Sequence, residues 1–228
     1  MSGRSSPRGF DMMRLSQAER VRMFDLAFPS TISREGSSTL FIHNGRICGL
    51  WDIGALYMRN YYKNPQGYYG AFPHKFKERV FALFPECRKV MHLFSGTIRP
   101  SKTKQREEIT FDMKPDFRPT ICDDVRNIEE YASVIRKQDL ILADPMYEKR
   151  DFEKHGQKPF DKWGTIRRLA PMMKTGAFLG WLDVYVPMFS NESWTRIVSI
   201  GVEVSTNTRM RVFTVLRKKS GQDERREK

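Results

Sequence analysis

A short segment in the second half of the chain combines an acidic side chain, a proline and an aromatic ring. It reads LILADPMY over residues 140–147, so an apolar run ends at Asp144. Asp144 can accept a hydrogen bond from an amino group, and the carbonyl of Pro145 can accept a second. Tyr147 offers a ring on which a nucleobase can stack, an interaction worth about 1–3 kcal/mol per base. These residue types fit an enzyme that holds the exocyclic amine of a base.

Three apolar runs upstream of this segment also end in a glycine or in aspartates. VMHLFSG ends in Gly96, EITFD ends in Asp112, and TICDD ends in Asp123 and Asp124. A glycine turn lets the backbone approach a ligand closely. An acidic residue that ends the second strand of a Rossmann-like sheet binds ribose hydroxyls, and a carboxylate after the third run can accept from an adenine amino group. Aspartate is also a common helix cap and turn residue, so each one taken alone also fits a structural role.

From residue 88 onward, the segments that must position these side chains alternate between strands and helices. We expect strands at 89–95, 108–113, 118–122, 139–145 and 176–186, helices at 124–136, 160–174 and about 190–199, and two final strands, VEVSTN and MRVFTVLRK. This alternation predicts an α/β fold with a Rossmann-like, doubly wound, mainly parallel sheet. The tightly joined final strands predict an antiparallel strand at or near one edge. Ligands of such sheets bind at the carboxyl ends of the strands.

The N-terminal third has a different pattern. It predicts an amphipathic helix at 14–28, a β-hairpin at 39–51 around the type I′ turn pair Asn44-Gly45, and a helix at 74–85. We therefore expect four parts: a disordered arm at 1–13, an extension that contains the hairpin at 14–69, the α/β domain at 70–218 and a disordered tail at 219–228.

The chain is strongly basic, with 40 Lys and Arg against 27 Asp and Glu and a net charge of +13. Such an excess attracts polyanions, of which nucleic acid is the commonest, although a solvated basic surface is the simpler alternative. Arg99, Lys102, Lys104 and Arg106 form a basic run that could contact phosphate or could lie in a merely solvated loop. No apolar run approaches the roughly 20 residues that cross a bilayer, and the first residues lack a signal-peptide core. These features predict a cytoplasmic protein without a membrane partner.

In order and spacing, HLFSG, ITFD, ICDD and ADPMY resemble the first four motifs of class I S-adenosylmethionine-dependent methyltransferases. ADPMY is similar to the D/N-P-P-Y/F signature of the N6-adenine and N4-cytosine amino-methyltransferases. GAFPHKFKERVFALFPE, residues 70–86, is similar to the motif that packs over the methionine end of their cofactor. The resemblance covers roughly residues 39–217 and extends to small phage and bacterial DNA methylases.

This resemblance implies S-adenosylmethionine as the cofactor and methyl transfer to an exocyclic amine as the reaction. It implies that the cofactor contacts Phe72, Phe94, Ser95, Gly96, Asp112 and either Asp123 or Asp124, and that the target base contacts Asp144, Pro145 and Tyr147. Adenine N6 in DNA is the first expectation, with RNA or cytosine N4 as alternatives, in a bacterial or phage-infected cell. The sequence does not indicate an oligomeric state.

Three departures from the family pattern accompany the resemblance. Met146 stands where the signature has its second proline, so the loop is less rigid. The crossover after Gly96 is short, and no long segment after ADPMY could form a separate recognition domain. A non-catalytic module that keeps the fold and binds nucleic acid is therefore the main rival.

Two other enzyme classes fit the sequence poorly. A nicotinamide-dependent oxidoreductase needs G-x-G-x-x-G after the first strand, where this chain has one glycine. A five-position cytosine methyltransferase needs a Pro-Cys nucleophile, and none of the three cysteines follows a proline.

Three further side chains near the motifs have simpler explanations. His92 falls inside a strand, which favours a buried and hydrogen-bonded core residue. Phe160 and Trp163 fit a base pocket and helix packing equally well.

Overall fold

The computed structural model describes residues 15–29, 37–53, 72–73, 75–100, 103, 105–147, 159–204 and 207–220 of the 228. The strands are β1 (Ser37–His43), β2 (Arg46–Ile53), β3 (Lys89–Leu93), β4 (Glu107–Asp112), β5 (Ile121–Cys122), β6 (Leu140–Ala143), β7 (Phe178–Asp183), β8 (Trp194–Val204) and β9 (Asn207–Lys218). The α-helices are α1 (Gln17–Ala27), α3 (Phe76–Leu83), α4 (Ala132–Ile135) and α6 (Lys162–Met172), and the 3-10 helices are η2 (Pro115–Phe117) and η3 (Val125–Tyr131). In these ranges, no helix has the length and apolar character that a membrane span requires.

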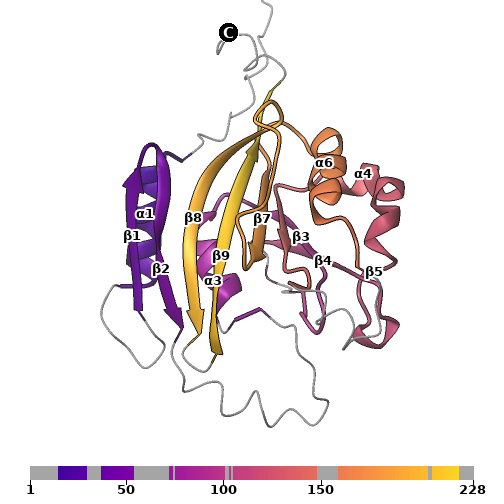
Figure 1. Ribbon diagram of the computed structural model, residues 1–228, viewed down its shortest axis with the longest axis horizontal. Helices are drawn as coiled ribbons and strands as arrows, with labels where there is room; N and C mark the ends of the chain where they lie inside the picture. The colour runs from indigo at the N-terminus through magenta and orange to yellow at the C-terminus, as the bar shows by residue number, and fades with distance from the viewer. Residues whose placement is uncertain are drawn as a thin grey trace, which may run out of the picture.

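All the described strands belong to one sheet, in the order β1-β2-β8-β9-β7-β6-β3-β4-β5 (Figure 1). Strands β3 to β7 are mutually parallel, and the chain reverses its direction of winding between β3 and β6. Strand β9 is antiparallel and lies between β7 and β8. The predicted doubly wound, mainly parallel sheet with an antiparallel strand is therefore confirmed. The antiparallel β9 lies inside the sheet rather than at its edge, because β8 and the hairpin β1–β2 extend the sheet beyond it. The winding also creates a topological switch point between β3 and β6, where ligands of open α/β sheets bind.

The predicted N-terminal hairpin forms and continues this sheet. Asn44 and Gly45 have φ angles of 48° and 70°, so both take the positive values that a type I′ turn requires. Strand β2 then pairs in parallel with β8, with Ile47 opposite Val198. Figure 1 shows α1 and the hairpin at one end of the molecule and α4 and α6 at the other.

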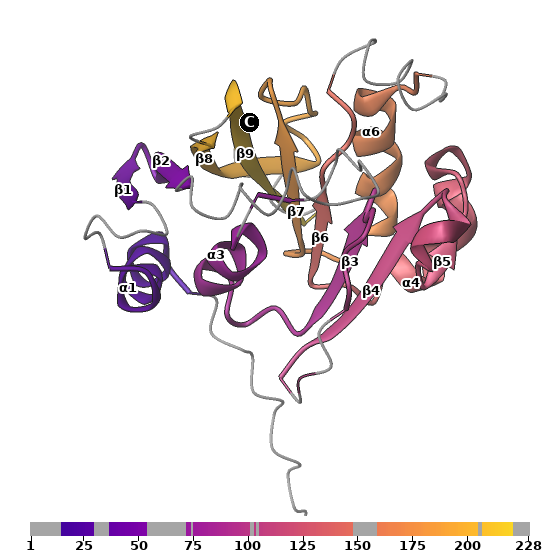
Figure 2. The ribbon, with the colours of Figure 1, turned by 90° about the horizontal axis from the view of Figure 1, so that it is seen from below.

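Helices cover both faces of the sheet, which gives three layers (Figure 2). Leu140 and Leu142 of β6 pack into the apolar cluster that contains residues of α1 and α3. Ile141 and Ala143, which alternate with them, pack into the opposite cluster with residues of α6 and η3. Because β6 is buried on both faces, its sequence is a continuous apolar run rather than an alternating one.

The predicted helix at about 190–199 is wrong, because strand β8 begins at Trp194 and continues to Val204. The pairing register between β8 and β9 shifts between Arg196 and Val198. This irregularity places the adjacent residues Ile197 and Val198 both in the buried core. A strand without strict two-residue alternation loses the pattern that distinguishes it from a helix.

Two other predicted elements are shorter or different. The expected helix at 124–136 is formed by η3 followed by α4, and the expected strand at 118–122 is reduced to Ile121 and Cys122. The arm at 1–13 and most of the tail at 219–228 lie outside the described residues.

Trp51 of β2 joins the hairpin to the rest of the molecule. It is fully buried, and its ring lies 5.6 Å from Phe24 of α1, 5.8 Å from Phe76 of α3 and 5.7 Å from Phe213 of β9. The hairpin is thus packed into the same core as the carboxyl-terminal strands.

We expect Trp51→Ala to lower the free energy of unfolding by about 3–5 kcal/mol, because it removes a large buried ring. The control is Phe41→Ala on β1, where the side chain is 54% exposed and the expected change is within about 0.5 kcal/mol. Denaturant unfolding monitored by circular dichroism measures both. Equal effects of the two substitutions would show that the hairpin does not share the core.

Candidate active site at the carboxyl edge of the sheet

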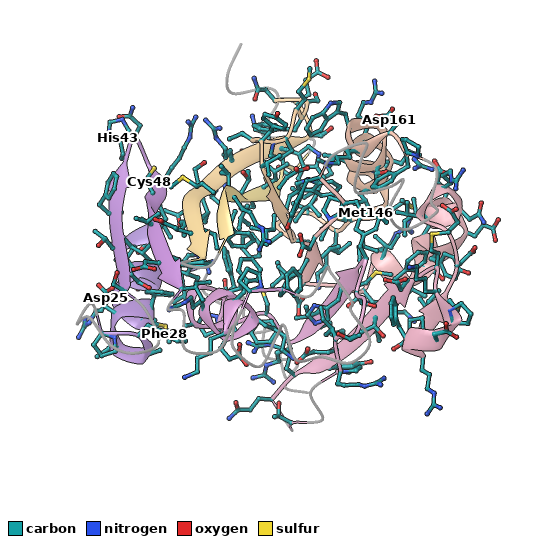
Figure 3. All side chains as sticks on the ribbon, turned by 60° about the horizontal axis from the view of Figure 1, so that its bottom comes forward. Asp25, Phe28, His43, Cys48, Met146 and Asp161 are labelled. Atoms are coloured by element: carbon teal, nitrogen blue, oxygen red, sulfur yellow. The ribbon has the colours of Figure 1, made fainter. Side chains whose placement is uncertain are left out.

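The sequence-predicted target-base residues follow β6 directly. We call residues 144–147 the target-base loop. In this loop, Pro145 is buried, Asp144 and Tyr147 are partly buried, and the Tyr147 hydroxyl donates a short hydrogen bond to Asp144 Oδ1. In Figure 3, Met146 lies on the same side of the molecule as Asp161 at the start of α6, opposite the hairpin. The hydrogen bond between Tyr147 and Asp144 brings the acid and the ring that the sequence singled out into direct contact.

Three charged residues from other elements surround this loop. Lys162, the first residue of α6, donates to the main-chain oxygen of Tyr147 at 3.0 Å and to Asp183 Oδ2 at 2.7 Å. Asp183 ends β7 and is fully buried. The guanidinium carbon of Arg211 lies 5.3 Å from the centroid of the Tyr147 ring, a cation–π distance.

The pKa of Asp144 is raised to about 7, mainly by burial and to a smaller extent by the nearby Asp183 carboxylate. Arg211, the hydrogen bond from Tyr147 and Lys162 act in the opposite direction. Burial is also the main cause that raises the pKa of Tyr147, followed by the negative charge of Asp144. Asp144 therefore changes charge close to neutral pH, which suits a group that must accept a proton during a reaction.

The turn after β3, residues 94–96, lies beside the target-base loop, because Leu93 and Ala143 are paired neighbours in the sheet. Phe94 and Gly96 have φ angles of 57° and 52°. The Gly96 amide donates to Asp112 Oδ2 at 2.8 Å, so the end of β4 holds this turn in place. Such a left-handed backbone favours glycine and is uncommon for phenylalanine, and strain of this kind is concentrated at functional sites.

The β3 turn also offers an unsatisfied polar atom and an aromatic wall. Ser95 is fully buried, and its hydroxyl oxygen has no hydrogen-bond partner among the described residues. The Phe94 ring stacks on Phe160 at 5.1 Å and meets the edge of Trp181 at 6.3 Å. A ligand hydroxyl or amine could satisfy the serine, and the rings could contact an apolar part of the same ligand.

The three predicted carboxylates at the ends of β4 and β5 have different surroundings. Asp112 accepts from the main-chain amides of Gly96 and Lys114. Asp123 is adjacent to it, since its amide donates to the Asp112 carbonyl at 3.1 Å, and its carboxylate accepts from Tyr131 Oη at 2.9 Å. Asp124 caps η3, where it accepts from the Arg126 amide at 2.9 Å. Asp124 thus has the structural role that the sequence left open.

Phe72 and His92 lie on the α3 side of the sheet. Phe72 stacks on Phe76 at 4.9 Å and meets His92 at 6.2 Å. His92 is fully buried and lies 2.9 Å from Glu108, which also pairs with Lys77 at 3.1 Å. His92 is therefore a buried residue that is hydrogen-bonded through Nε2, as predicted, whereas its Nδ1 has no partner among the described residues.

The predicted phosphate contacts are only partly within the described residues. Arg99 is exposed and donates to the carbonyl of Phe117 at 3.2 Å. Arg106 donates to the carbonyl of Cys87 at 2.8 Å and covers the Phe81 ring at 3.8 Å, so it supports the packing of the protein. Lys102 and Lys104 lie outside the described residues.

Sequence reasoning missed Lys162, Asp183 and Arg211. Asp183 had a usable signal, because it ends an apolar strand in the same way as Asp144. Arg211 had none in its own segment. It reaches the site because antiparallel β9 brings its first half to the carboxyl edge of the sheet, where its neighbour Val212 pairs with Asp183.

No protein-family model matches the chain, and neither does any curated protein sequence. Among solved structures, TrmN from Thermus thermophilus is 14% identical, with a TM-score of 0.40, over 57% of this chain and 44% of that protein. A predicted SAM-dependent methyltransferase from Streptococcus mutans is 12% identical, with a TM-score of 0.46, over 82% of this chain and 56% of that one. A further predicted methyltransferase, complexed with SAH, is 13% identical, with a TM-score of 0.38, over 82% and 57%. This chain spans about half the length of each, and likeness at this level concerns the fold alone.

The raised pKa of Asp144 predicts a pH-dependent stability difference between the wild type and Asp144→Asn. Between about pH 4 and pH 7 the unfolded chain loses the Asp144 proton while the folded chain keeps it. The wild-type free energy of unfolding therefore falls through this window relative to the variant, and the difference levels off above about pH 7. Urea unfolding of both proteins from pH 4 to pH 8 measures this. A difference that is constant across the range would contradict the raised pKa.

Proposed function

We propose that this protein transfers a methyl group from S-adenosylmethionine to an exocyclic amino group of a nucleobase, with adenine N6 in DNA as the first target. The proposal rests on one observation: the target-base loop and the β3 turn lie side by side at the switch point of the sheet. Asp144, Pro145 and Tyr147 supply the groups that hold an amine and a base. The β3 turn and Asp112 supply the groups that fit a cofactor.

The residues around the β3 turn fit S-adenosylmethionine. The unpartnered Ser95 hydroxyl can bond a polar group of the cofactor. Asp112 accepts two main-chain N–H groups, and because a carboxylate offers about four acceptor sites, it keeps capacity for ribose hydroxyls. Asp123 and Asp124 each already accept three hydrogen bonds, so Asp112 has more free capacity than either. When bound, the cofactor supplies an electrophilic methyl group.

The residues of the target-base loop would act on the amine. The Asp144 carboxylate accepts a hydrogen bond from the amino group, the Pro145 carbonyl accepts a second, and Tyr147 stacks on the base. The amine must lose one proton as it gains the methyl group, and Asp144, with a pKa of about 7, can accept that proton near neutral pH. The remaining contribution of the protein is to hold the two reactants in line.

Nucleic acid is the proposed partner. The net charge of +13 favours its approach, and a base inside a duplex must leave the stack to reach such a site. Tyr185 and Met188 follow β7 at the same edge of the sheet and are 65% and 69% exposed, so they are available to contact bases beside the target. RNA, cytosine N4 and a module that binds without methyl transfer are the alternatives that a methyl-transfer assay separates.

We expect labelled methyl groups to pass from S-adenosylmethionine to duplex DNA when the purified protein is incubated with both. Single-stranded DNA and RNA are tested in parallel, and nucleoside analysis identifies the methylated amine. Asp144→Ala should lower the rate by roughly 10²- to 10⁴-fold, because it removes the proton acceptor. Cofactor binding without label in any of the three polymers would overturn the proposed enzyme and favour the binding module.

The pH dependence of the reaction gives a second test. The value of kcat/KM should rise with pH and level off above about 7, because the ionised Asp144 carboxylate is the form that accepts the proton. Steady-state rates from pH 5.5 to pH 8.5 measure it. A profile that falls with pH through this range would exclude the ionised Asp144 as the acting form.

A further inference from the structure

A buried ion pair lies directly behind the target-base loop. The Lys162 ammonium donates to the Tyr147 carbonyl at 3.0 Å and to Asp183 Oδ2 at 2.7 Å. Their side chains are 14% and 1% exposed. One ammonium therefore joins the loop after β6, the first residue of α6 and the last residue of β7.

The Asp183 carboxylate is itself held in a fixed orientation. Its Oδ1 accepts from the Val184 amide at 2.7 Å, and its Oδ2 lies 3.4 Å from Trp181 Nε1. Two charges lose their hydration when they are buried, and an apolar pair of similar size is often as stable as a buried ion pair. The position of this ion pair, in contact with the target-base loop, points to a role beyond stability.

The backbone of the target-base loop is less restricted than that of a loop with two prolines. Pro145 fixes φ at one position only, and Met146 leaves the next position without the restriction that a second proline would impose. The hydrogen bond from Lys162 holds the Tyr147 carbonyl, and therefore the backbone that carries the Tyr147 ring. The hydroxyl of that ring bonds Asp144.

We propose that the Lys162–Asp183 ion pair is the positioning device of the target-base loop and supplies the rigidity that the second proline gives in the D/N-P-P-Y/F signature. This inference rests on the proposed function, since it assigns a role within the same site. Lys162 and Asp183 are positioning residues, because they act through Tyr147 and Asp144.

The two partners also affect Asp144 with opposite signs. Among the residues that the structure describes, the charged and titratable groups that face Asp144 are Tyr147 in its own loop, Lys162 at the start of α6, Asp183 at the end of β7 and Arg211 on β9. Lys162 favours the ionised carboxylate, whereas Asp183 opposes it. Removing one partner should therefore move the titration of Asp144 in the opposite direction to removing the other. A general loss of packing would not produce such a pair of opposite shifts.

The test compares Lys162→Met, Asp183→Asn and Lys162→Arg with the wild type. We expect Lys162→Met to lower kcat by on the order of 10²-fold, the effect of misplacing a reacting group by about 1 Å, with a much smaller change in KM for DNA. Lys162→Arg keeps the positive charge and the donors and should recover most of the lost rate. Lys174→Met is the matched control. Lys174 follows the other end of α6 and pairs with Asp139 at the amino end of β6, so its removal should leave kcat unchanged.

A readout independent of activity is the titration of the Asp144 carboxyl carbon, followed by NMR. The midpoint should lie near 7 in the wild type, higher in Lys162→Met and lower in Asp183→Asn. The positioning role would be overturned if the Asp144 midpoint is the same in the variants as in the wild type. It would also be overturned if the wild type is active and Lys162→Met is equally active. If the two variants show opposite shifts but the wild type transfers no methyl group, the proposed reaction is overturned, whereas the electrostatic part of the inference remains supported.

Discussion

The parallel pairing of β3 with β6 is the constraint on which the candidate site depends. Leu93 lies opposite Ala143, so the chain leaves both strands at the same level and the β3 turn lies beside the target-base loop. Alternate residues of β6 are buried in different apolar clusters on the two faces of the sheet. A slip of one residue would therefore exchange the faces of every side chain on the strand. The hydrophobic core thus fixes the register, and the register places the polar groups.

Within this frame, the charge of Asp144 is set by a balance between burial and its neighbours. Burial and Asp183 favour the protonated form, whereas Arg211, Lys162 and the Tyr147 hydroxyl favour the ionised form. These groups come from the target-base loop, α6, β7 and β9. A property of one carboxyl group therefore depends on four segments that meet only in the folded protein.

Much of this arrangement was predictable from sequence because its signals are local. The Asn44-Gly45 turn, the apolar run that ends at Asp144 and the glycine turn after β3 can each be read from a few residues. The first part of β8, residues 194–199, was not predictable in this way, since its irregular register removes the two-residue alternation. Lys162 and Arg211 were missed because only the crossover to α6 and the antiparallel pairing of β9 bring them to the site. The capping role of Asp124 is also local, but sequence alone could not separate it from ligand binding.

The parallel pairing of β2 with β8 has a consequence for how the chain is made. It joins residues 47–53 to residues 198–204, so β2 can pair with β8 only after nearly all of the chain has been synthesised. During synthesis from the amino terminus, the hairpin leaves the ribosome long before its neighbour in the sheet exists. Contacts of such wide sequence separation slow folding. Until β8 has been synthesised, the β2 edge of the hairpin presents backbone N–H and C=O groups without a strand to pair with.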